Sequence, residues 1–109
     1  MKALLLGDLS PTISTNPLFE KHDIETLFSD TISVFENNDI NFFNLECVLT
    51  NRSEAIEKFG PALKATAETA AVMKKLNFDY CTVCNNHFFD FGTDGVTDSF
   101  KVLDEVGIT

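Results

Sequence analysis

The sequence has little of several residue types that would point to a specialised class of protein. It contains no tryptophan, one tyrosine, two histidines and three cysteines among 109 residues. Three cysteines cannot all pair within one chain, and their spacing is not that of a disulfide scaffold, so a reducing environment is the simpler interpretation. No apolar run approaches the roughly 20 residues that span a bilayer, so we expect no membrane segment in this chain.

Basic residues are also scarce. Eight lysines and arginines stand against seventeen aspartates and glutamates, which gives a net charge of -9. Such a charge repels phosphate backbones and anionic lipids, so we expect neither nucleic acid nor membrane partners. The N-terminus passes from Met1 and Lys2 into a short apolar run that breaks at Gly7 without a cleavage site, which favours a strand over a signal peptide. As written, the chain is expected to be cytoplasmic or an excised part of an exported protein.

Apolar runs and helical periodicities alternate along the chain. Short apolar runs at 2–6, 40–45 and 80–84 are typical of buried strands. Apolar spacings of three and four predict helices at 24–35, about 66–76 and about 93–106. The alternation predicts an α/β fold with a layered sheet of mostly parallel strands and helices on both faces. Because Ile108 and Thr109 stand where a fourth strand would begin, we interpret residues 1–109 as a single, truncated domain.

Polar side chains follow each apolar run. They are Asp8 after the first, Asn44 and Glu46 at the end of the second, and Asn85, Asn86 and His87 after the third. The carboxyl ends of parallel strands share one sheet edge, where ligands bind in open α/β folds. Carboxylate, amide and imidazole groups together suit a divalent cation, although Asp and Asn are also ordinary turn formers.

Four blocks of the sequence resemble, in order and spacing, those of a known family. They are Gly7-Asp8, Asn44-Leu45-Glu46, Gly60-Pro61-Ala62-Leu63 and Asn85-Asn86-His87-x-x-Asp90-x-Gly92. From end to end, the chain resembles the N-terminal part of the CapA family of bacterial poly-γ-glutamate capsule synthesis proteins. That family is similar to the calcineurin-like metallophosphatases, whose four-layer sandwich binds two metal ions at strand ends.

The resemblance implies a role for individual residues. Asp8 would be a ligand of the first metal, Glu46 would contact or bridge the metals, and Asn86 would bind the second metal. His87 would stabilise or protonate the reacting group, and Asp90 would either orient His87 or cap its loop. The implied cofactors are divalent ions such as Mn, Mg, Fe or Zn, which would activate water against a phosphoester. The implied substrate is a small molecule or polymer that carries phosphate or carboxylate groups.

The sequence also departs from the metallophosphatase pattern. Ser10 stands where those enzymes commonly have a histidine, and the later histidine block is absent from residues 1–109. His22 is expected to be a solvated surface residue rather than a ligand. Full catalysis by this chain alone is therefore not expected. Members of the family are often membrane-associated or exported.

Other interpretations stay open at this point. A non-catalytic module would associate with itself or with a partner chain, and Phe42 and Phe43 on an uncovered strand motivate that alternative. A small flavodoxin-like binding domain would explain the alternation but leaves the Asn-Asn-His block without a purpose. Arg52 and Lys58, in the loop at 50–61, are expected to be solvated charges.

Overall fold

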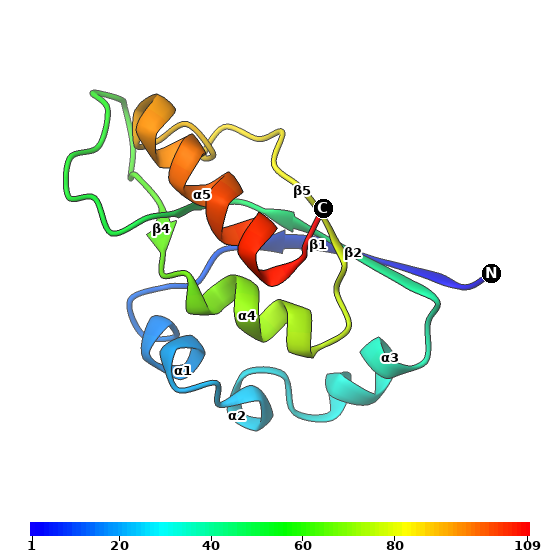
Figure 1. The fold of residues 1–109 in the computed structure, drawn as a ribbon. Helices are drawn as coiled ribbons and strands as arrows, with labels where there is room; N and C mark the ends of the chain where they lie inside the picture. The colour runs from blue at the N-terminus through cyan, green and yellow to red at the C-terminus, as the bar shows by residue number, and fades with distance from the viewer.

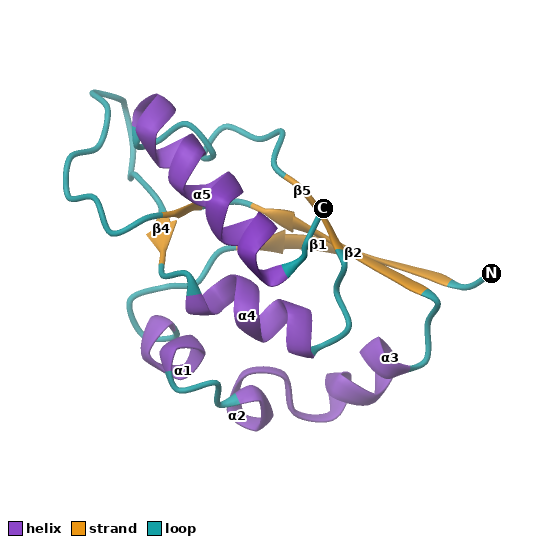
Figure 2. Ribbon diagram, in the orientation of Figure 1, coloured by secondary structure: helices purple, strands orange, loops and turns teal.

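A computed structural model describes residues 1–109. The elements in chain order are β1 (Ala3–Leu9), α1 (Asn16–Glu20), α2 (Ile24–Phe28), the 3-10 helix η1 (Ser29–Thr31), α3 (Ile32–Glu36), β2 (Ile40–Leu45), β3 (Val48–Leu49), β4 (Lys64–Ala65), α4 (Glu68–Lys75), β5 (Tyr80–Thr82) and α5 (Gly92–Val106). Figure 1 shows α4 and α5 next to the strands, with α1, α2 and α3 in an arc beyond α4. Figure 2 shows the long loop between β3 and β4 at the opposite end from the N-terminus.

Three parallel strands form the main sheet, in the order β1-β2-β5. The expected α/β class with a parallel sheet is therefore confirmed. A second, two-stranded parallel sheet joins β3 to β4. Beside β5, the Thr109 N–H donates to the Asp79 carbonyl and the Cys81 N–H donates to the Thr109 carbonyl, each at 2.9 Å. These two bonds have the slanted pattern of a parallel pair, at the place where a fourth strand was expected.

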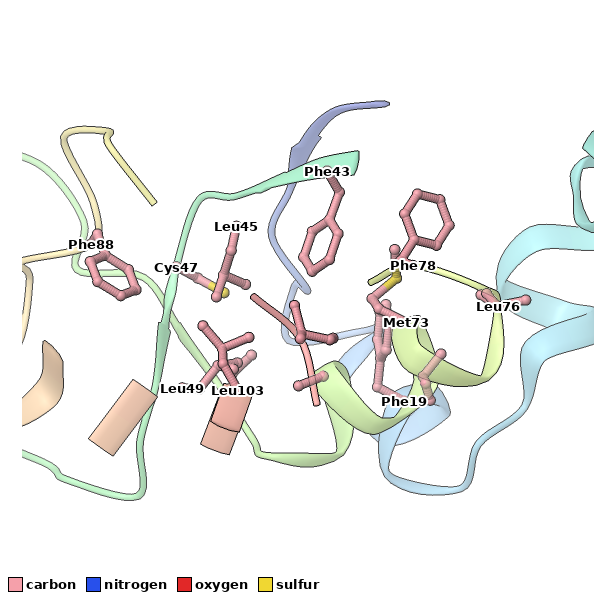
Figure 3. Close-up of a cluster of buried hydrophobic side chains, with 14 of the residues drawn as sticks. Phe19, Phe43, Leu45, Cys47, Leu49, Met73, Leu76, Phe78, Phe88 and Leu103 are labelled. Carbon is pink, nitrogen blue, oxygen red and sulfur yellow. The ribbon is translucent and has the colours of Figure 1, made fainter. Parts of the chain in front are cut away.

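The core lies on one face of the main sheet. Along β2, Asn41, Phe43 and Leu45 are buried while the residues between them are partly exposed, as the two-residue period of a strand requires. Figure 3 shows Phe43 and Leu45 pointing the same way from β2, toward α4 and Leu103. The Phe43 ring packs edge-on against Phe78 at 5.7 Å between centroids. Each of these rings buries a large apolar area, so this face supplies the main stabilisation of the fold.

The opposite face of the sheet is open. Leu5, Phe42 and Tyr80 are cross-strand neighbours in one row, and Leu5 is 77% exposed. Phe42 and Tyr80 stack with their centroids 5.0 Å apart, yet none of the three belongs to the core cluster. The expectation that Phe42 and Phe43 share an uncovered surface is thus wrong for Phe43, because strand alternation sends it into the core. The helices of residues 1–109 pack against the core face.

The helical segments follow the periodicity with one interruption. The helix expected at 24–35 is divided into α2, η1 and α3, because Ser29 adopts a positive φ of 47° at the end of α2. Asp23 caps α2, as its side chain accepts from the Thr26 N–H. Helix α5 ends at Gly107, whose left-handed φ of 76° is the usual conformation of a helix C-cap. None of the helices has the length and apolar character needed to cross a membrane.

Removing the Phe43 ring tests the position of the core. We expect Phe43→Ala to lower the free energy of unfolding by about 3–5 kcal/mol, because it leaves a cavity under β2. Phe59→Ala is the matched control, since Phe59 is fully exposed in the loop, and it should change stability by less than about 0.5 kcal/mol. Urea denaturation of the two variants and the wild type measures the difference. Equal losses for both variants would contradict this assignment of the core.

Candidate functional site

An irregularity in the pairing of β1 with β2 determines where Asp8 points. Leu5 pairs with Phe42, but Asp8 pairs with Asn44 instead of Leu45, so β1 holds one extra residue between Leu5 and Asp8. With regular pairing, Asp8 would share the core-facing row of Leu45. A one-residue shift exchanges the two faces of a strand, so the Asp8 carboxylate lies on the Asn44 side. Asp8 therefore lies inside β1. The sequence had placed it after the first strand.

Two asparagines join the ends of the three strands. Asn44 donates from Nδ2 to Asp8 Oδ1 at 2.7 Å, and its Oδ1 accepts from Thr82 Oγ1 at 2.9 Å. Asn85 donates to the Leu45 carbonyl at 2.9 Å, and its Oδ1 accepts the N–H groups of His87 at 3.0 Å and the next residue at 3.1 Å. These bonds fix the start of the Asn-Asn-His turn against β2. Both asparagines are structural supports of the strand-end edge.

Asp8 and Glu46 lie next to each other at this edge. The Glu46 N–H donates to the Leu9 carbonyl at 3.0 Å, which extends the β1–β2 pairing to the residue that follows β2. Hydrogen bonding to Asp8, together with partial desolvation and charge repulsion, raises the pKa of Glu46, whereas His87 acts to lower it. Hydrogen bonds with Asn44 and Glu46 lower the pKa of Asp8. Two adjacent carboxyl groups, within electrostatic reach of an imidazole, thus meet where parallel strands end.

Asp90 contacts His87 and is almost fully buried. Its side chain is 1% exposed, and Oδ2 lies 2.7 Å from His87 Nδ1. An ionised carboxylate only accepts hydrogen bonds, so Nδ1 carries the proton in this contact. In the neutral imidazole, Nε2 is then free to accept a proton or bind an ion. Desolvation opposes ionisation of Asp90, but the bonds from Lys58, His87 and the Leu63 N–H outweigh it and lower the pKa of Asp90.

The loop between β3 and β4 is fastened to Asp90 at three points. Lys58 Nζ forms an ion pair with Asp90 Oδ1, and the Leu63 N–H donates to Oδ2 at 2.7 Å. The Ile56 N–H donates to the Asp90 carbonyl at 2.9 Å. A loop without regular structure is normally mobile, but these contacts hold it against the His87 turn. Lys58 was expected to be a solvated charge, and the buried carboxylate opposite it explains why it is not.

Two other basic residues also have partners that the sequence did not indicate. Arg52 lies 2.9 Å from Asp98 and 3.1 Å from Asp94, on the first turns of α5. Arg52 thus has ion-pair partners, but its side chain is 47% exposed, so it remains the solvated charge that was expected. His22, expected to be solvated, donates from Nε2 to the Glu68 carboxylate and accepts at Nδ1 from Lys75 Nζ at 2.5 Å. These partners come from α4 and α5, which are distant in sequence, so local composition gave no signal for them.

The donor set for a metal is partial in residues 1–109. Asp8 and Glu46 offer adjacent oxygen donors, which suit one side of a divalent cation. Asn86 is exposed, and its side chain makes no hydrogen bond, so its oxygen is not committed elsewhere. No group of three or more His, Cys, Asp or Glu side chains is arranged to hold a metal ion. The residues therefore fit part of a metal site, and the complete ligand set is not present in this chain.

The main surface cavity lies away from this edge. It has a volume of about 470 Å³ and is lined by Leu49, Thr50, Asn51, Arg52, Ala67, Asp98, Lys101, Val102 and Glu105. Its charged groups are already paired with one another, as in the Arg52–Asp98 contact. None of the five residues proposed for the site lines it. The strand-end edge is thus an open surface, whereas an enclosed pocket would normally surround a small substrate.

A Glu46→Gln substitution tests the carboxyl pair. The raised pKa of Glu46 favours folding at low pH, and this contribution is lost as pH rises above the ordinary value of 4.5. The glutamine amide that replaces the carboxyl group resembles the protonated acid at every pH. In chelator, we expect Glu46→Gln to have a higher Tm than the wild type at about pH 7 and nearly the same Tm at about pH 4.

The control for that measurement is Glu54→Gln, because Glu54 is exposed in the long loop. Its Tm difference from the wild type should be the same at both pH values. Thermal melts followed by circular dichroism supply all the values. A Tm for Glu46→Gln below that of the wild type at neutral pH would mean that Glu46 is not repelled by Asp8.

Comparison with known proteins places the chain in a family. The family model described as bacterial capsule synthesis protein PGA_cap matches residues 2–109. Probable polyglutamine synthesis accessory proteins from two strains of Mycobacterium tuberculosis are each 28% identical over 83 residues, which covers 74% of this chain and 22% of theirs. An uncharacterized protein of Sinorhizobium fredii is 27% identical over 86 residues, or 74% of this chain and 19% of its own length.

The family match extends over almost the whole chain. The chain spans about a fifth of the length of the curated relatives it matches. The family model covers all of the strand-end residues described above, from Asp8 to Asp90. The resemblance that the ordered sequence blocks indicated is therefore confirmed: the chain belongs to the bacterial capsule synthesis protein family PGA_cap.

Proposed function

We propose that residues 1–109 form part of a divalent-metal phosphoesterase-like site that serves the synthesis of capsule or poly-γ-glutamate. The observation that carries the proposal is that strand pairing places Asp8 and Glu46 side by side where β1 and β2 end, since Asp8 pairs with Asn44 and the Glu46 N–H donates to the Leu9 carbonyl at 3.0 Å. Adjacent carboxylates repel each other, and a bound cation would relieve that repulsion. A protein gains little stability from such a pair, so its position at the ligand-binding edge of a parallel sheet favours a functional role.

In this proposal each residue has a distinct task. Asp8 and Glu46 would provide carboxylate ligands for the cation, and Asn86 would add an amide oxygen from the neighbouring turn. A divalent ion, when bound, supplies Lewis acidity toward a phosphoryl oxygen or a water molecule. His87 presents Nε2 for proton transfer to or from the reacting group, because Nδ1 is occupied by Asp90. A phosphate- or carboxylate-bearing small molecule or polymer is the proposed substrate class.

Residues 1–109 would supply only part of the complete site. The carboxyl pair, the amide and one imidazole fall short of the donors that a two-metal centre needs, and no cluster of three acidic, Cys or His side chains is present. We propose that further ligands come from the rest of a family-length protein. The mycobacterial relatives are named as polyglutamine synthesis accessory proteins, and a supporting role in polymer synthesis is the corresponding proposal for this chain.

Isothermal titration of the metal-free protein with Mn²⁺ tests the proposal. We expect measurable binding at a single site in the wild type and a loss of at least about tenfold in affinity for Glu46→Ala, since one of two charged ligands is removed. Glu54→Ala removes the same charge from the exposed loop and should bind like the wild type. Because the net charge is -9, this control separates a specific site from general attraction of cations. Identical heats for Glu46→Ala and Glu54→Ala would count against the site.

A second candidate function is a non-catalytic module that associates through the open face of the sheet. Leu5, Phe42 and Tyr80 form a continuous apolar row there, with Leu5 largely exposed. Apolar rows of this kind are usually covered by another chain or another part of the same protein. This alternative does not require the Asp8 and Glu46 pair to bind anything.

Light scattering at increasing protein concentration distinguishes this alternative. Under it, the wild type would dimerise and Leu5→Lys, which places a charge in the row, would remain monomeric. Ile13→Lys is the control, because Ile13 is also an exposed aliphatic residue but lies in the loop after β1. A wild type that stays monomeric at high concentration would exclude self-association.

A further inference from the structure

The loop between β3 and β4 reaches the His87 imidazole through a single buried carboxylate. Lys58, on this loop, is 32 residues from Asp90 in sequence, yet it forms an ion pair with Asp90 Oδ1. Its side chain is only 19% exposed, which is unusual for a lysine in a loop. A partly buried ammonium group has to be paired, and burying it costs free energy that a solvated lysine would not lose. Solubility therefore does not explain why the chain has a lysine at position 58.

The geometry of the three charged groups gives that reason. Asp90 uses Oδ1 for Lys58 and Oδ2 for His87 Nδ1 and the Leu63 N–H. Lys58 Nζ also lies 3.5 Å from His87 Nδ1. Since both the ammonium group and the Nδ1–H are donors, they cannot bond to each other and must both point at the carboxylate. Lys58 thus holds one carboxylate oxygen while the other faces the imidazole.

We infer that Lys58 is a positioning residue for His87, acting through Asp90 to hold the imidazole in the Nδ1–H tautomer with Nε2 free. Free neutral imidazole exchanges its proton between the two nitrogens, and the acceptor next to the ring selects the tautomer. Here the acceptor itself depends on the β3–β4 loop, because Lys58 and the Leu63 N–H are two of its three side-chain bonds. The functional meaning of the free Nε2 rests on the proposed function, but the positioning does not.

The consequence is that loop position and imidazole state are coupled. If the loop moved away, Asp90 would lose Lys58 and Leu63 together and would remain as a buried charge with His87 as its only side-chain partner. Such a carboxylate is unfavourable and would turn toward water. The imidazole would then lose the acceptor that fixes its tautomer. The loop therefore contributes to the site without placing one of its own side chains on the reacting group.

Nuclear magnetic resonance of the imidazole nitrogens tests this inference directly. The whole chain is labelled with ¹⁵N, and long-range proton–nitrogen spectra are recorded without metal, at a pH where both imidazoles are neutral. The chain has two histidines, so His22→Gln assigns the His87 signals. In the wild type we expect the Nδ1–H tautomer to predominate. Lys58→Met should shift the tautomer equilibrium of His87 toward the Nε2–H form. Lys58→Arg, which keeps the charge, should have the same tautomer populations as the wild type.

Matched variants keep the result interpretable. Lys64→Met removes the lysine at the start of β4, which donates to the Arg52 carbonyl near the beginning of the same loop, and it should leave the His87 tautomer unchanged. Asp90→Asn should shift the tautomer at least as far as Lys58→Met. If Lys58→Met does not fold, Lys58→Gln retains a donor without the charge and should give an intermediate shift. A wild-type tautomer pattern in folded Lys58→Met or Lys58→Gln would overturn the inference.

The two proposals can fail independently. The tautomer spectra need neither metal nor substrate, whereas the calorimetric titration reports only on Asp8 and Glu46. Loss of the tautomer effect with intact Mn²⁺ binding would remove the role of Lys58 and leave the proposed function in place. A normal tautomer effect without Mn²⁺ binding would remove the proposed function and leave the role of Lys58 in place.

Discussion

Parallel pairing of β1, β2 and β5 is the constraint on which the candidate site depends. Parallel strands end at the same edge, so side chains that are distant in sequence are brought together there. Pairing alone is not sufficient, however. The extra residue in β1 turns Asp8 away from the core row and toward Asn44, and only then do the Asp8 and Glu46 carboxyl groups become neighbours. One irregularity in one strand therefore brings together the two carboxyl groups that are proposed to bind a cation.

The rest of the site depends on Asp90. Its carboxylate is buried, and its bonds join the His87 turn to the long loop and to the start of β4. A buried charge with several donors is rigid, because losing any donor leaves an unfavourable unpaired group. The arrangement thus gives an otherwise irregular region a fixed geometry next to β5. The carboxyl pair and the Asp90 network are separate in their bonding but meet at His87, which influences Glu46 electrostatically.

The sequence indicated the strands and the shared edge because apolar runs and strand-end polar residues are local signals. The pairing of His87 with Asp90 could also be anticipated, since three residues separate them within one turn. The bulge in β1 could not, because it depends on which residues of β2 pair with it. The contact of Lys58 could not be predicted either, because its partner is 32 residues away. Strands β3 and β4 were missed because two residues are too few to show an alternation of apolar and polar side chains. Ser29 divides the expected helix by a backbone conformation that apolar spacing does not report.

The most direct test of the central claim is paramagnetic broadening of amide signals by a small amount of Mn²⁺. Broadening that is strongest at Asp8, Glu46 and Asn86, and that disappears in Glu46→Ala, is the result that the account predicts. Such a pattern would locate the ion at the edge created by the bulge in β1. Broadening centred on the acidic residues of α5, or spread evenly over the surface, would show that Asp8 and Glu46 are not a metal site.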